Sequence, residues 1–408
     1  MQDSHLYEQI LGLTEPWFVQ QVDLDVAAQR VTVMVAHRAD ATWCCPRCDQ
    51  PAPLYDHSPL RCWRHLDTCQ FQTHVEARPP RVNCSEHGVC TVKLPWAEPN
   101  GRFTLLMEQF VIDVLQACQN IRAACRLINI SWDQASHVMH RAVARGLRRR
   151  RKEPVRYLGV DEKRFRRGHV YATVVTDLDE AAVQEVTEHH TRESLAGYYR
   201  ELSPEQLEGI EAIAMDMHQA YISATVEHVP DGINKIVFDR FHVMRQANEA
   251  LEQVRSMEHR QLPGPGKNIL TGAKQMLLWS DENRPDKYAD RFDQLRRRNL
   301  QTGRAWAMKE MLRQLWDQPS VRHARAFFNH WRSWVEREAI RPMMRVVKML
   351  TPRIESVIRF CEHPLTTATC EGINSRITAI QHRAAGYRNF QRLRQAIFFF
   401  CGKLDLYP

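Results

Sequence analysis

Two aspartates that follow apolar segments are the first residues in this sequence whose type and position suggest chemistry. Asp161 ends residues 157–161 (YLGVD), and Asp216 ends residues 213–216 (IAMD). A carboxylate at the end of a buried strand is costly unless it is paired or binds a cation. On neighbouring strands the two carboxylates would repel each other, and a divalent cation would relieve that repulsion. Hard oxygen ligands suit Mg²⁺ or Mn²⁺, so the pair predicts a metal site.

Glu371 can add a third carboxylate from a helix expected at residues 369–380. Two cations about 3.5–4 Å apart can activate a water or a 3′-hydroxyl group and stabilise the leaving oxygen of a phosphodiester. Spacing alone does not select these residues, because an aspartate after a strand is often a turn former or a helix N-cap. Four aspartates compete locally: Asp177, Asp179, Asp231 and Asp239.

Cysteine spacing predicts a second metal site. Seven of the twelve cysteines lie within residues 44–90, and such clustering is typical of a metal site rather than a disulfide framework. Two chelating pairs, Cys45 with Cys48 and Cys84 with His87, supply four ligands for a tetrahedral structural Zn²⁺. The cysteines at positions 44 and 90 are alternative ligands. A closed site of this kind would support structure and DNA contact, not catalysis.

Hydrophobic periodicity predicts strands and then helices in the first third of the chain. Residues 17–36 alternate as a β-hairpin, and two more strands are expected near 60–66 and 69–77. Ser131 is an expected N-cap, with Gln134 completing a capping box. Two short helices joined at residues 129–130 fit a helix-turn-helix, which would offer its second helix to a DNA major groove. The helices are expected at 103–118, 121–128 and 131–146.

From residue 155 the periodicity changes to that of a sheet. The order β-β-β-α-β-α-β is that of a ribonuclease-H-like mixed sheet. Residues 241–360 contain no convincing strand, which predicts an all-helical insertion. Its tryptophans are expected to pack in a core, with stacking on extruded DNA bases as the alternative; they are Trp306, Trp316, Trp331 and Trp334. The strands are expected at 155–162, 169–177, 181–187, 209–215 and 233–238, and the helices at 191–202 and 219–228.

Basic residues are distributed unevenly. Residues 145–152 contain six cations, and more follow in a basic tail after residue 380. Such runs favour a polyanionic partner, because neutralised phosphates release counterions, although a single run can also be a solvated helix end. The residues expected to contact DNA are Arg148, Arg149, Arg150, Arg151, Lys152, Arg376, Arg383 and Arg388.

Five segments, in order, resemble the bacterial insertion-sequence transposases of the ISL-three (ISL3) family, which are of the DDE type. The resemblance runs from about residue 40 to the C-terminus. The segments are GVDE at 159–162 with GHVY at 168–171, MDM at 215–217 with AY at 220–221, DRFHV at 239–243, EGIN at 371–374 and GYRN at 386–389.

The resemblance implies roles for individual residues. Asp161, Asp216 and Glu371 would be the catalytic acids that bind two Mg²⁺ or Mn²⁺ ions. Asp239 and His242 match an Asp-x-x-His element of the wider group, which implies a supporting role in the active site. The helical stretch before Glu371 would be the insertion domain seen in related DDE enzymes. Related sequences carry a second Cys-x-x-Cys where this chain ends in a histidine, which is also a zinc ligand.

The sequence therefore predicts an α+β multidomain transposase that binds terminal inverted repeats, cleaves phosphodiester bonds and joins the 3′-hydroxyl ends to target DNA. Action on two ends predicts at least a homodimer. No apolar run of about 18 residues and no signal peptide are found, so we expect a cytoplasmic, nucleoid-associated bacterial protein. Two alternatives are a catalytically silent transposase-derived DNA-binding regulator and a nuclease without strand transfer.

Domain boundaries follow from the same patterns. The expected domains are an N-terminal β/zinc-ribbon domain at 1–98, a helix-turn-helix domain at 99–153, the first part of the ribonuclease-H-like core at 154–244, the helical insertion at 245–364, and the last part of the core with its basic tail at 365–408.

Overall fold

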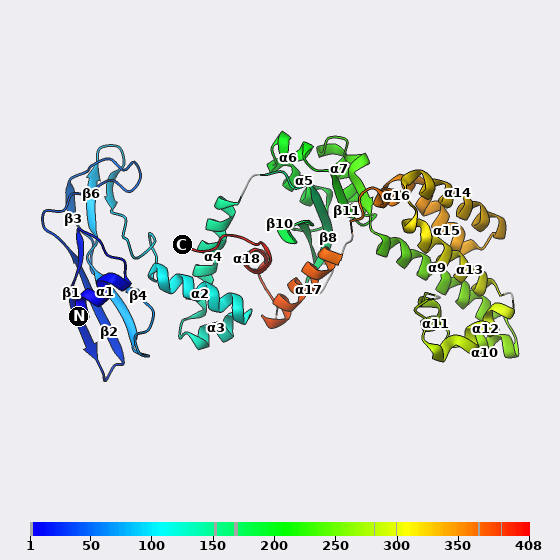
Figure 1. The fold of residues 1–408 in the computed structure, drawn as a ribbon, viewed down its shortest axis with the longest axis horizontal. Helices are drawn as coiled ribbons and strands as arrows, with labels where there is room; N and C mark the ends of the chain where they lie inside the picture. The colour runs from blue at the N-terminus through cyan, green and yellow to red at the C-terminus, as the bar shows by residue number, and fades with distance from the viewer. Residues whose placement is uncertain are drawn as a thin grey trace. The chain divides into compact units, whose positions relative to one another are not determined.

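The computed structural model describes residues 3–150, 153–166, 170–280, 282–298, 300–365, 368–384 and 386–408. The chain forms two compact units, whose elements are labelled in Figure 1. Unit 1 contains residues 1–150, 382–386 and 398–408, and unit 2 contains residues 151–381 and 387–397. In the described residues, no helix combines the length and the apolarity that crossing a bilayer requires.

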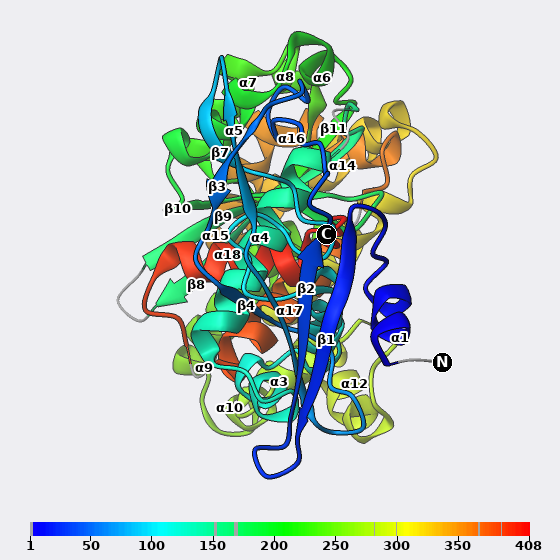
Figure 2. The same ribbon diagram turned by 90° about the vertical axis from the view of Figure 1, so that its left-hand side faces the viewer.

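Unit 1 begins with a short helix, α1 (Asp3–Ile10), followed by two β-sheets. A four-stranded sheet has the order β1-β2-β5-β4, and a three-stranded sheet has the order β3-β6-β7. The predicted hairpin is present as β1 and β2, the paired blue strands in Figure 2. Val33 and Val75 are fully buried, because alternate side chains of a strand point to one face. The strands are β1 (Trp17–Asp25), β2 (Arg30–His37), β3 (Leu54–His57), β4 (Arg61–Arg64), β5 (Gln72–Ala77), β6 (Pro80–Cys84) and β7 (Gly88–Thr91).

Three helices follow the sheets, close to the predicted positions. They are α2 (Leu105–Cys118), α3 (Ile121–Leu127) and α4 (Trp132–Arg149). The predicted capping box at the start of α4 is confirmed. The Gln134 backbone N–H donates to Ser131 Oγ at 3.1 Å, and the Ser131 N–H donates to Gln134 Oε1 at 2.8 Å. These bonds satisfy two of the backbone groups that a helix start leaves without partners.

Unit 2 is built on a five-stranded mixed sheet with the order β10-β9-β8-β11-β12. β8, β11 and β12 are parallel, whereas β9 and β10 run antiparallel to their neighbours. The predicted order of strands and helices is present, with two short helices added, α6 (Pro204–Glu208) and α8 (Gly232–Lys235). Residues 167–169, between β8 and β9, lie outside the described residues. The strands are β8 (Tyr157–Arg166), β9 (Val170–Asp177), β10 (Ala182–Glu188), β11 (Ala212–Met215) and β12 (Ile236–Phe238).

The prediction for the last strand was partly wrong, because residues 233–235 belong to α8. Asp231 has a φ of 53°, and a Cβ at Gly232 would lie 2.4 Å from the Thr225 carbonyl oxygen. The chain therefore turns tightly at a position that only glycine fills without displacement. Only the last three residues of the expected strand pair with β11.

Helices cover both faces of this sheet. α5 (Arg192–Glu201) and α7 (Gln219–His228) lie on one face, where their side chains share a core with Leu158 and Val160 of β8. α17 (Ala368–Arg383) lies against the other face of β8, as Figure 1 shows. The expected basic tail is instead largely helical, because residues 390–401 form α18 (Phe390–Cys401). Its residue Arg394 pairs with Glu185 of β10 at 2.8 Å.

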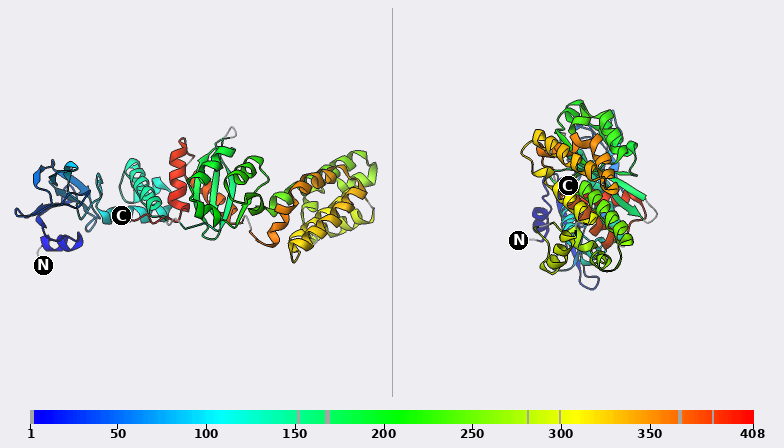
Figure 3. Two further views of the ribbon diagram at one scale, coloured as in Figure 1. Left: turned by 90° about the horizontal axis from the view of Figure 1, so that it is seen from above. Right: turned by 90° about the vertical axis from the view of Figure 1, so that its right-hand side faces the viewer.

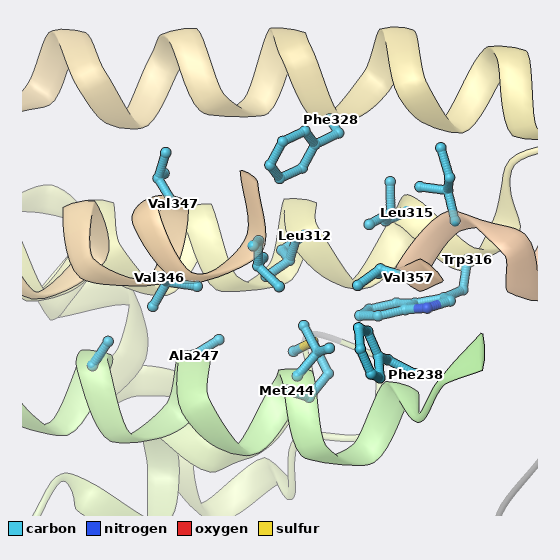
Figure 4. Close-up of a cluster of buried hydrophobic side chains, with 14 of the residues drawn as sticks. Phe238, Met244, Ala247, Leu312, Leu315, Trp316, Phe328, Val346, Val347 and Val357 are labelled. Atoms are coloured by element: carbon cyan, nitrogen blue, oxygen red, sulfur yellow. The ribbon is translucent and has the colours of Figure 1, made fainter. Parts of the chain in front are cut away.

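The described residues between β12 and α17 form helices joined by turns and contain no strand, as predicted. α9, α13, α14 and α15 pack against one another and form the yellow-green bundle of Figure 3. Figure 4 shows Trp316 and Phe328 among the apolar side chains between these helices. The expected core role of Trp306, Trp316 and Trp331 is confirmed by their burial. The helices are α9 (Arg240–Gln261), α10 (Gly264–Leu270), α11 (Lys274–Leu278), α12 (Ala289–Arg297), α13 (Gln301–Arg313), α14 (Val321–Glu338), α15 (Arg341–Leu350) and α16 (Ile354–Ile358), with 3₁₀ turns at Asp286–Tyr288, Gln314–Asp317, Thr351–Arg353 and Arg359–Cys361.

Candidate active site and metal centre

Three aspartates follow one another across the parallel strands of unit 2. The register aligns the residues that precede them on β8, β11 and β12. Asp161, Asp216 and Asp239 therefore form a row, with neighbouring backbones about 4.8 Å apart. The preceding residues belong to the core beneath α5 and α7. Because successive side chains of a strand alternate, the aspartates point to the opposite face, where α17 lies.

Asp161 does not end its strand, contrary to the expectation from the sequence. β8 continues to Arg166 and keeps pairing with β9, whereas its parallel neighbour β11 ends at Met215. Residues 161–165 are charged except for Phe165, and their exposure alternates, with Asp161, Lys163 and Phe165 less exposed than Glu162 and Arg164. The aspartate thus lies at the point where the sheet becomes narrower.

Burial and like charge raise the pKa of Asp161. Burial is the largest cause of its pKa of about 6, and the negative charge of Asp216 raises the pKa further. The backbone N–H group of Glu162 and the charge of His242 act in the opposite direction. A divalent cation beside two such carboxylates would replace repulsion by attraction. The electrostatics of the row therefore suit a bound cation.

Backbone N–H groups hold one oxygen of each aspartate. The bonds are Glu162 N to Asp161 Oδ1 at 2.7 Å, His218 N to Asp216 Oδ1 at 3.0 Å, and Phe241 N to Asp239 Oδ1 at 3.0 Å. The last bond also makes Asp239 the N-cap of α9, a role that an aspartate after a strand often has. It nevertheless stands in the same row as the other two aspartates.

His242 lies on the first turn of α9, beside this row. Its Nε2 atom is 3.8 Å from Asp239 Oδ2, and its charge acts on Asp161. Its Nδ1 atom is buried and has no hydrogen-bond partner among the described residues. The imidazole is thus close enough to influence the carboxylates.

α17 brings Glu371 towards the row. Asn374, one turn after Glu371, donates from Nδ2 to Asp161 Oδ2 at 2.5 Å. Residues three apart on a helix share a face, so Glu371 and Asn374 point to the same side of α17. The Glu371 side chain is exposed to solvent and can therefore approach a ligand.

Lys163 fastens α17 to β8. Its Nζ atom donates to the Asn374 carbonyl oxygen at 2.9 Å and to Thr378 Oγ1 at 2.5 Å. Lys163 is two residues after Asp161, so both side chains lie on the face that α17 covers. Together with the Asn374 bond, this contact fixes the helix that carries Glu371 relative to the strand that carries Asp161.

The carboxylates of Asp161, Asp216 and Glu371 do not form a compact chelate. Within the described ranges, the only group of three or more His, Cys, Asp or Glu side chains with ligand atoms within 4.8 Å of one another lies in unit 1. Two ions about 3.5–4 Å apart, each about 2.1 Å from its oxygens, accommodate ligand atoms up to roughly 8 Å apart. A site shared by two ions would therefore not require all three carboxylates to lie within bonding distance of one ion.

Gly159 allows α17 to approach β8 closely. A Cβ atom at this position would lie 2.3 Å from Cys370 Sγ and 2.8 Å from Leu178 Cδ2. We expect Gly159→Ala to lower the free energy of unfolding by about 1–3 kcal/mol, as overpacking does. In a Cys370→Ala background the same change should cost less, because the nearest atom is gone.

Urea unfolding of the four variants of this double-mutant cycle measures the effect. The matched control is Gly372→Ala on α17, where an added Cβ has no atom within 4 Å and alanine favours the helix. Equal unfolding free energies for Gly159→Ala and Gly372→Ala would show that the close approach does not matter.

Four candidate zinc ligands converge in unit 1. Cys45 and Cys48 lie in a turn before β3, and Cys84 and His87 lie where β6 turns into β7. Their ligand atoms are all within 4.8 Å of one another. The distances Cys45 Sγ–His87 Nδ1, Cys48 Sγ–Cys84 Sγ and Cys84 Sγ–His87 Nδ1 are each 3.7 Å. Tetrahedral Zn²⁺ with bonds of about 2.1–2.3 Å has edges of about 3.6–3.8 Å, so the donor set fits zinc.

Backbone groups prepare this cluster for a metal. The N–H group of Arg47 is the largest cause that lowers the pKa of Cys45, to about 6, and the N–H group of Cys48 also lowers it. The thiolate is the form that binds metal. Cys90 lies outside the cluster and its thiol faces the His87 carbonyl oxygen at 3.5 Å. Histidine therefore occupies the fourth position.

The arginines expected to contact DNA differ in their surroundings. Arg149 is exposed but bonds to the Tyr407 carbonyl oxygen at 2.7 Å and to Asp405 at 3.0 Å. Arg150 donates to the Gly402 carbonyl oxygen at 3.3 Å. The basic residues Arg149 and Arg150 at the end of α4 thus bind the C-terminal residues of the chain. The remaining candidates Arg148, Arg376, Arg383 and Arg388 are exposed, whereas Arg151 and Lys152 lie outside the described residues.

Sequence reasoning assigned no role to two residues that organise the carboxylates. Asn374 lay within one of the segments that resemble the ISL3 family, and Lys163 belongs to no segment to which a role was assigned. The spacing of Asn374 from Glu371 was a usable signal, because residues three apart on a helix share a face. No local sequence pattern indicated that Lys163 would bind Asn374 and Thr378 of α17.

Comparisons with known proteins agree with these features. Residues 158–397, more than half of the chain, match the DDE-type ISL3 family model described as a transposase. Residues 92–143 match the helix-turn-helix domain of transposase family ISL3, and residues 41–90 match the zinc finger of the transposases of IS204, IS1001, IS1096 and IS1165.

Two relatives match nearly end to end. The transposase for insertion sequence element IS1001 of Bordetella parapertussis is 26% identical over 404 residues, which cover 97% of this chain and 98% of that protein. The transposase for insertion sequence element IS1557 of Mycobacterium tuberculosis is 26% identical over 422 residues, covering 96% and 94%. With its mixed α/β architecture, helix-turn-helix and zinc-ribbon segments, this chain belongs to the ISL3 family of DDE transposases.

Proposed function

We propose that this chain cleaves DNA at the ends of an insertion sequence and joins the resulting 3′-hydroxyl groups to target DNA. Asp161, Asp216 and Glu371 would share two Mg²⁺ or Mn²⁺ ions. The observation that carries the proposal is the aspartate row facing α17, where Asn374 ties the helix of Glu371 to Asp161. Three separate segments of sequence thereby contribute acidic groups to one face of one sheet.

The architecture supports a ribonuclease-H-like core. Three parallel strands beside two antiparallel ones, with helices on both faces, agree with the strand order expected of that fold. We propose that residues 154–244 and 365–408 form this core around a helical insertion at 245–364. Residues 1–98 and 99–153 would form the zinc-ribbon and helix-turn-helix domains that bind the terminal repeats.

The residues of the site have separable roles in this chemistry. Bound Mg²⁺ or Mn²⁺ ions would activate a water or a 3′-hydroxyl group and stabilise the leaving oxygen. Asn374 holds Asp161 Oδ2 and the Glu162 N–H group holds Oδ1, so the remaining lone pairs of this carboxylate would be presented to a cation in a defined direction. His242 would contact the scissile phosphate or orient Asp239. Cys370 is not a nucleophile here, since burial raises the pKa of its thiol to about 12.

DNA binding and assembly complete the proposal. The helix-turn-helix and the zinc ribbon would recognise the terminal repeat through phosphate contacts for position and base edges for sequence. Cleavage of two ends in concert requires at least a homodimer. The zinc ion would be structural, because four protein ligands leave no open position for catalysis.

The rate of cleavage should fall at acidic pH, and the midpoint of that fall should depend on the Mg²⁺ concentration. Protonation of Asp161, whose pKa without metal is about 6, removes the charge that binds the cation. The rate should therefore fall as pH drops through about 6, well above the range of an ordinary aspartate. Raising Mg²⁺ should move the midpoint to lower pH, because metal and proton compete. A midpoint that is independent of Mg²⁺ would assign the titration to another group.

The test of the function uses the full chain and a labelled duplex from the end of the element that encodes it. Incubation with Mg²⁺ should produce a nicked or cut end and, with a target duplex, a joined product. Cleavage without joining would reduce the function to that of a nuclease. Tight, repeat-specific binding without cleavage in Mg²⁺ or Mn²⁺ would identify a DNA-binding regulator instead.

A further inference from the structure

Two adjoining hollows in unit 1 are lined by basic side chains. One has a volume of about 280 Å³ and lies between residues 100–103 and the first half of α4. The other, of about 440 Å³, lies between residues 100–102 and strands β4 and β5. Both are lined by Asn100, Arg102 and Gln134, so the two hollows adjoin at these residues and are treated together. We call the pair the junction groove; its main polar side chains are Arg61, His74, Arg102, Gln134, His137 and Arg141.

The groove carries uncompensated positive charge. Its lining, all within residues 61–141 of the described chain, contains four arginines, three histidines and no acidic residue. Two of the arginines are neutralised by acidic residues beside the groove, Arg64 by Asp67 and Arg141 by Glu108. Arg61 and Arg102 have no ion pair with any described acidic residue.

Arg61 and Arg102 differ in how their side chains are held. Arg61 donates from Nη2 to the Gly101 carbonyl oxygen at 3.1 Å, and its guanidinium group lies 4.7 Å from the centroid of the Trp63 ring. Its position is therefore fixed while its charge stays available. Arg102 is exposed to solvent. A planar guanidinium group of this kind suits two-point contact with a phosphate.

His74 is a partly buried side chain in the wall of the groove. Burial is the largest cause that lowers the pKa of His74, and the charges of Arg30 and Arg64 lower it further. Its Nδ1 atom is buried and has no hydrogen-bond partner among the described residues. Arg30 and Arg64 are themselves paired with Glu76 and Asp67, so the wall beside His74 adds little net charge and the positive charge of the groove comes from Arg61 and Arg102.

Hydrogen bonds make the groove rigid. The Arg64 N–H group donates to the Arg102 carbonyl oxygen at 3.0 Å, and the Thr104 N–H group donates to the Arg64 carbonyl oxygen at 3.0 Å. His65 Nδ1 and Thr104 Oγ1 are 2.8 Å apart. β4 is therefore joined directly to the segment that leads into α2, so the backbone that carries Arg61 is tied to the backbone that carries Arg102.

We propose that the junction groove binds the phosphodiester backbone of duplex DNA while α4 enters the neighbouring major groove. This rests on the proposed function, which supplies duplex DNA as the substrate. In a helix-turn-helix the N-terminal residues of the second helix contact base edges. Gln134 and His137, three residues apart on the first turns of α4, line the groove. A duplex on this part of α4 must therefore carry its backbone past Arg61 and Arg102.

The salt dependence of binding tests the proposal in the full-length protein. Each phosphate contact contributes about 0.9 to the slope of log K against log salt concentration. We expect Arg102→Ala to reduce this slope by about 1 and to weaken binding to terminal-repeat and unrelated duplexes alike. Arg102→Ala combined with Arg61→Ala should reduce the slope by about 2. Fluorescence anisotropy with labelled duplexes measures each slope.

Two control variants sharpen the result. Arg38→Ala removes an exposed cation of unit 1 that pairs with Glu15 at 3.0 Å and lies outside the groove, so its slope should stay as in the parent. Arg102→Lys keeps the charge and should retain most of the slope. Circular dichroism and zinc content of Arg102→Ala should match the parent, because the side chain is exposed. Should Arg102→Ala fail to fold, Arg102→Gln and Arg61→Gln carry the same expectation.

Distinct outcomes separate this inference from the proposed function. If the slopes of Arg102→Ala and Arg38→Ala are the same, the groove does not bind DNA, whatever the enzyme cleaves. An Arg102-dependent slope seen only with single-stranded DNA would overturn the assignment to duplex. If the slope falls as expected but the parent protein cuts no terminal-repeat duplex in Mg²⁺, the groove assignment stands and the proposed catalysis fails.

Discussion

Asp161→Ala is expected to abolish cleavage of terminal-repeat DNA, with a loss of about 1,000-fold or more. Removing one carboxylate from a two-metal site removes a ligand of the ions that stabilise charge in the transition state, and a 1,000-fold loss corresponds to about 4 kcal/mol in the barrier. The same loss is expected for Asp216→Ala and Glu371→Ala. Binding to the repeat should remain, because the helix-turn-helix lies in unit 1.

Asp177→Asn is the matched control for these variants. Asp177 is the last residue of β9 and is buried, and burial raises the pKa of its carboxyl group, as it does for Asp161. Its Oδ1 atom accepts the N–H groups of Asp179 and Glu180, each at 3.0 Å. Asparagine keeps that acceptor, so cleavage should persist. A gel assay at saturating DNA compares the four variants; normal cutting by any one of the three alanine variants would remove that residue from the proposed site.

Cys45→Ser should release zinc and unfold the surrounding part of unit 1. Structural Zn²⁺ contributes on the order of 10–16 kcal/mol of apparent binding free energy in small zinc domains, so loss of one thiolate removes a large share of what holds this segment. We expect loss of bound zinc and at least about a tenfold loss of DNA affinity. Treatment with a chelator should have the same effect on the parent protein.

Cys44→Ser is the matched control, because Cys44 is adjacent in sequence but exposed and outside the cluster. His87→Ala should behave like Cys45→Ser, whereas His87→Cys should retain the metal, since thiolate also binds Zn²⁺. Zinc content measured with a chromogenic chelator, together with anisotropy, decides the matter. Retention of zinc by Cys45→Ser, or its loss from Cys44→Ser, would show that the ligand set is different.

Local sequence patterns predicted the parts of this protein that depend on local rules. Alternating residues revealed the β1–β2 hairpin, and Ser131 with Gln134 revealed the start of α4. The two chelating pairs pointed to a convergence of four ligands because the spacing within each pair restricts its geometry. Asp161 and Asp216 were candidates because a buried carboxylate favours a bound cation, but the resemblance to a known family was needed to choose them over the other aspartates nearby.

Features that depend on register or docking could not be predicted in this way. The position of Asp239 in the aspartate row follows from the pairing of β11 with β12, and β12 has only three residues. The close approach of Cys370 to Gly159 requires α17 to be in place. Arg149 was predicted to contact DNA because it lies in a basic run. Its bonds to Asp405 and Tyr407 join positions more than 250 residues apart, so no local pattern could reveal them.

The most direct test of the two-metal site is anomalous diffraction from crystals of the full chain with cut terminal-repeat DNA and Mn²⁺. We predict two peaks about 3.5–4 Å apart, with Asp161 between them, Asp216 bound to one and Glu371 within about 2.2 Å of the other. A single peak, or a Glu371 carboxylate that contacts neither ion, would contradict the assignment of these three acids to one catalytic centre.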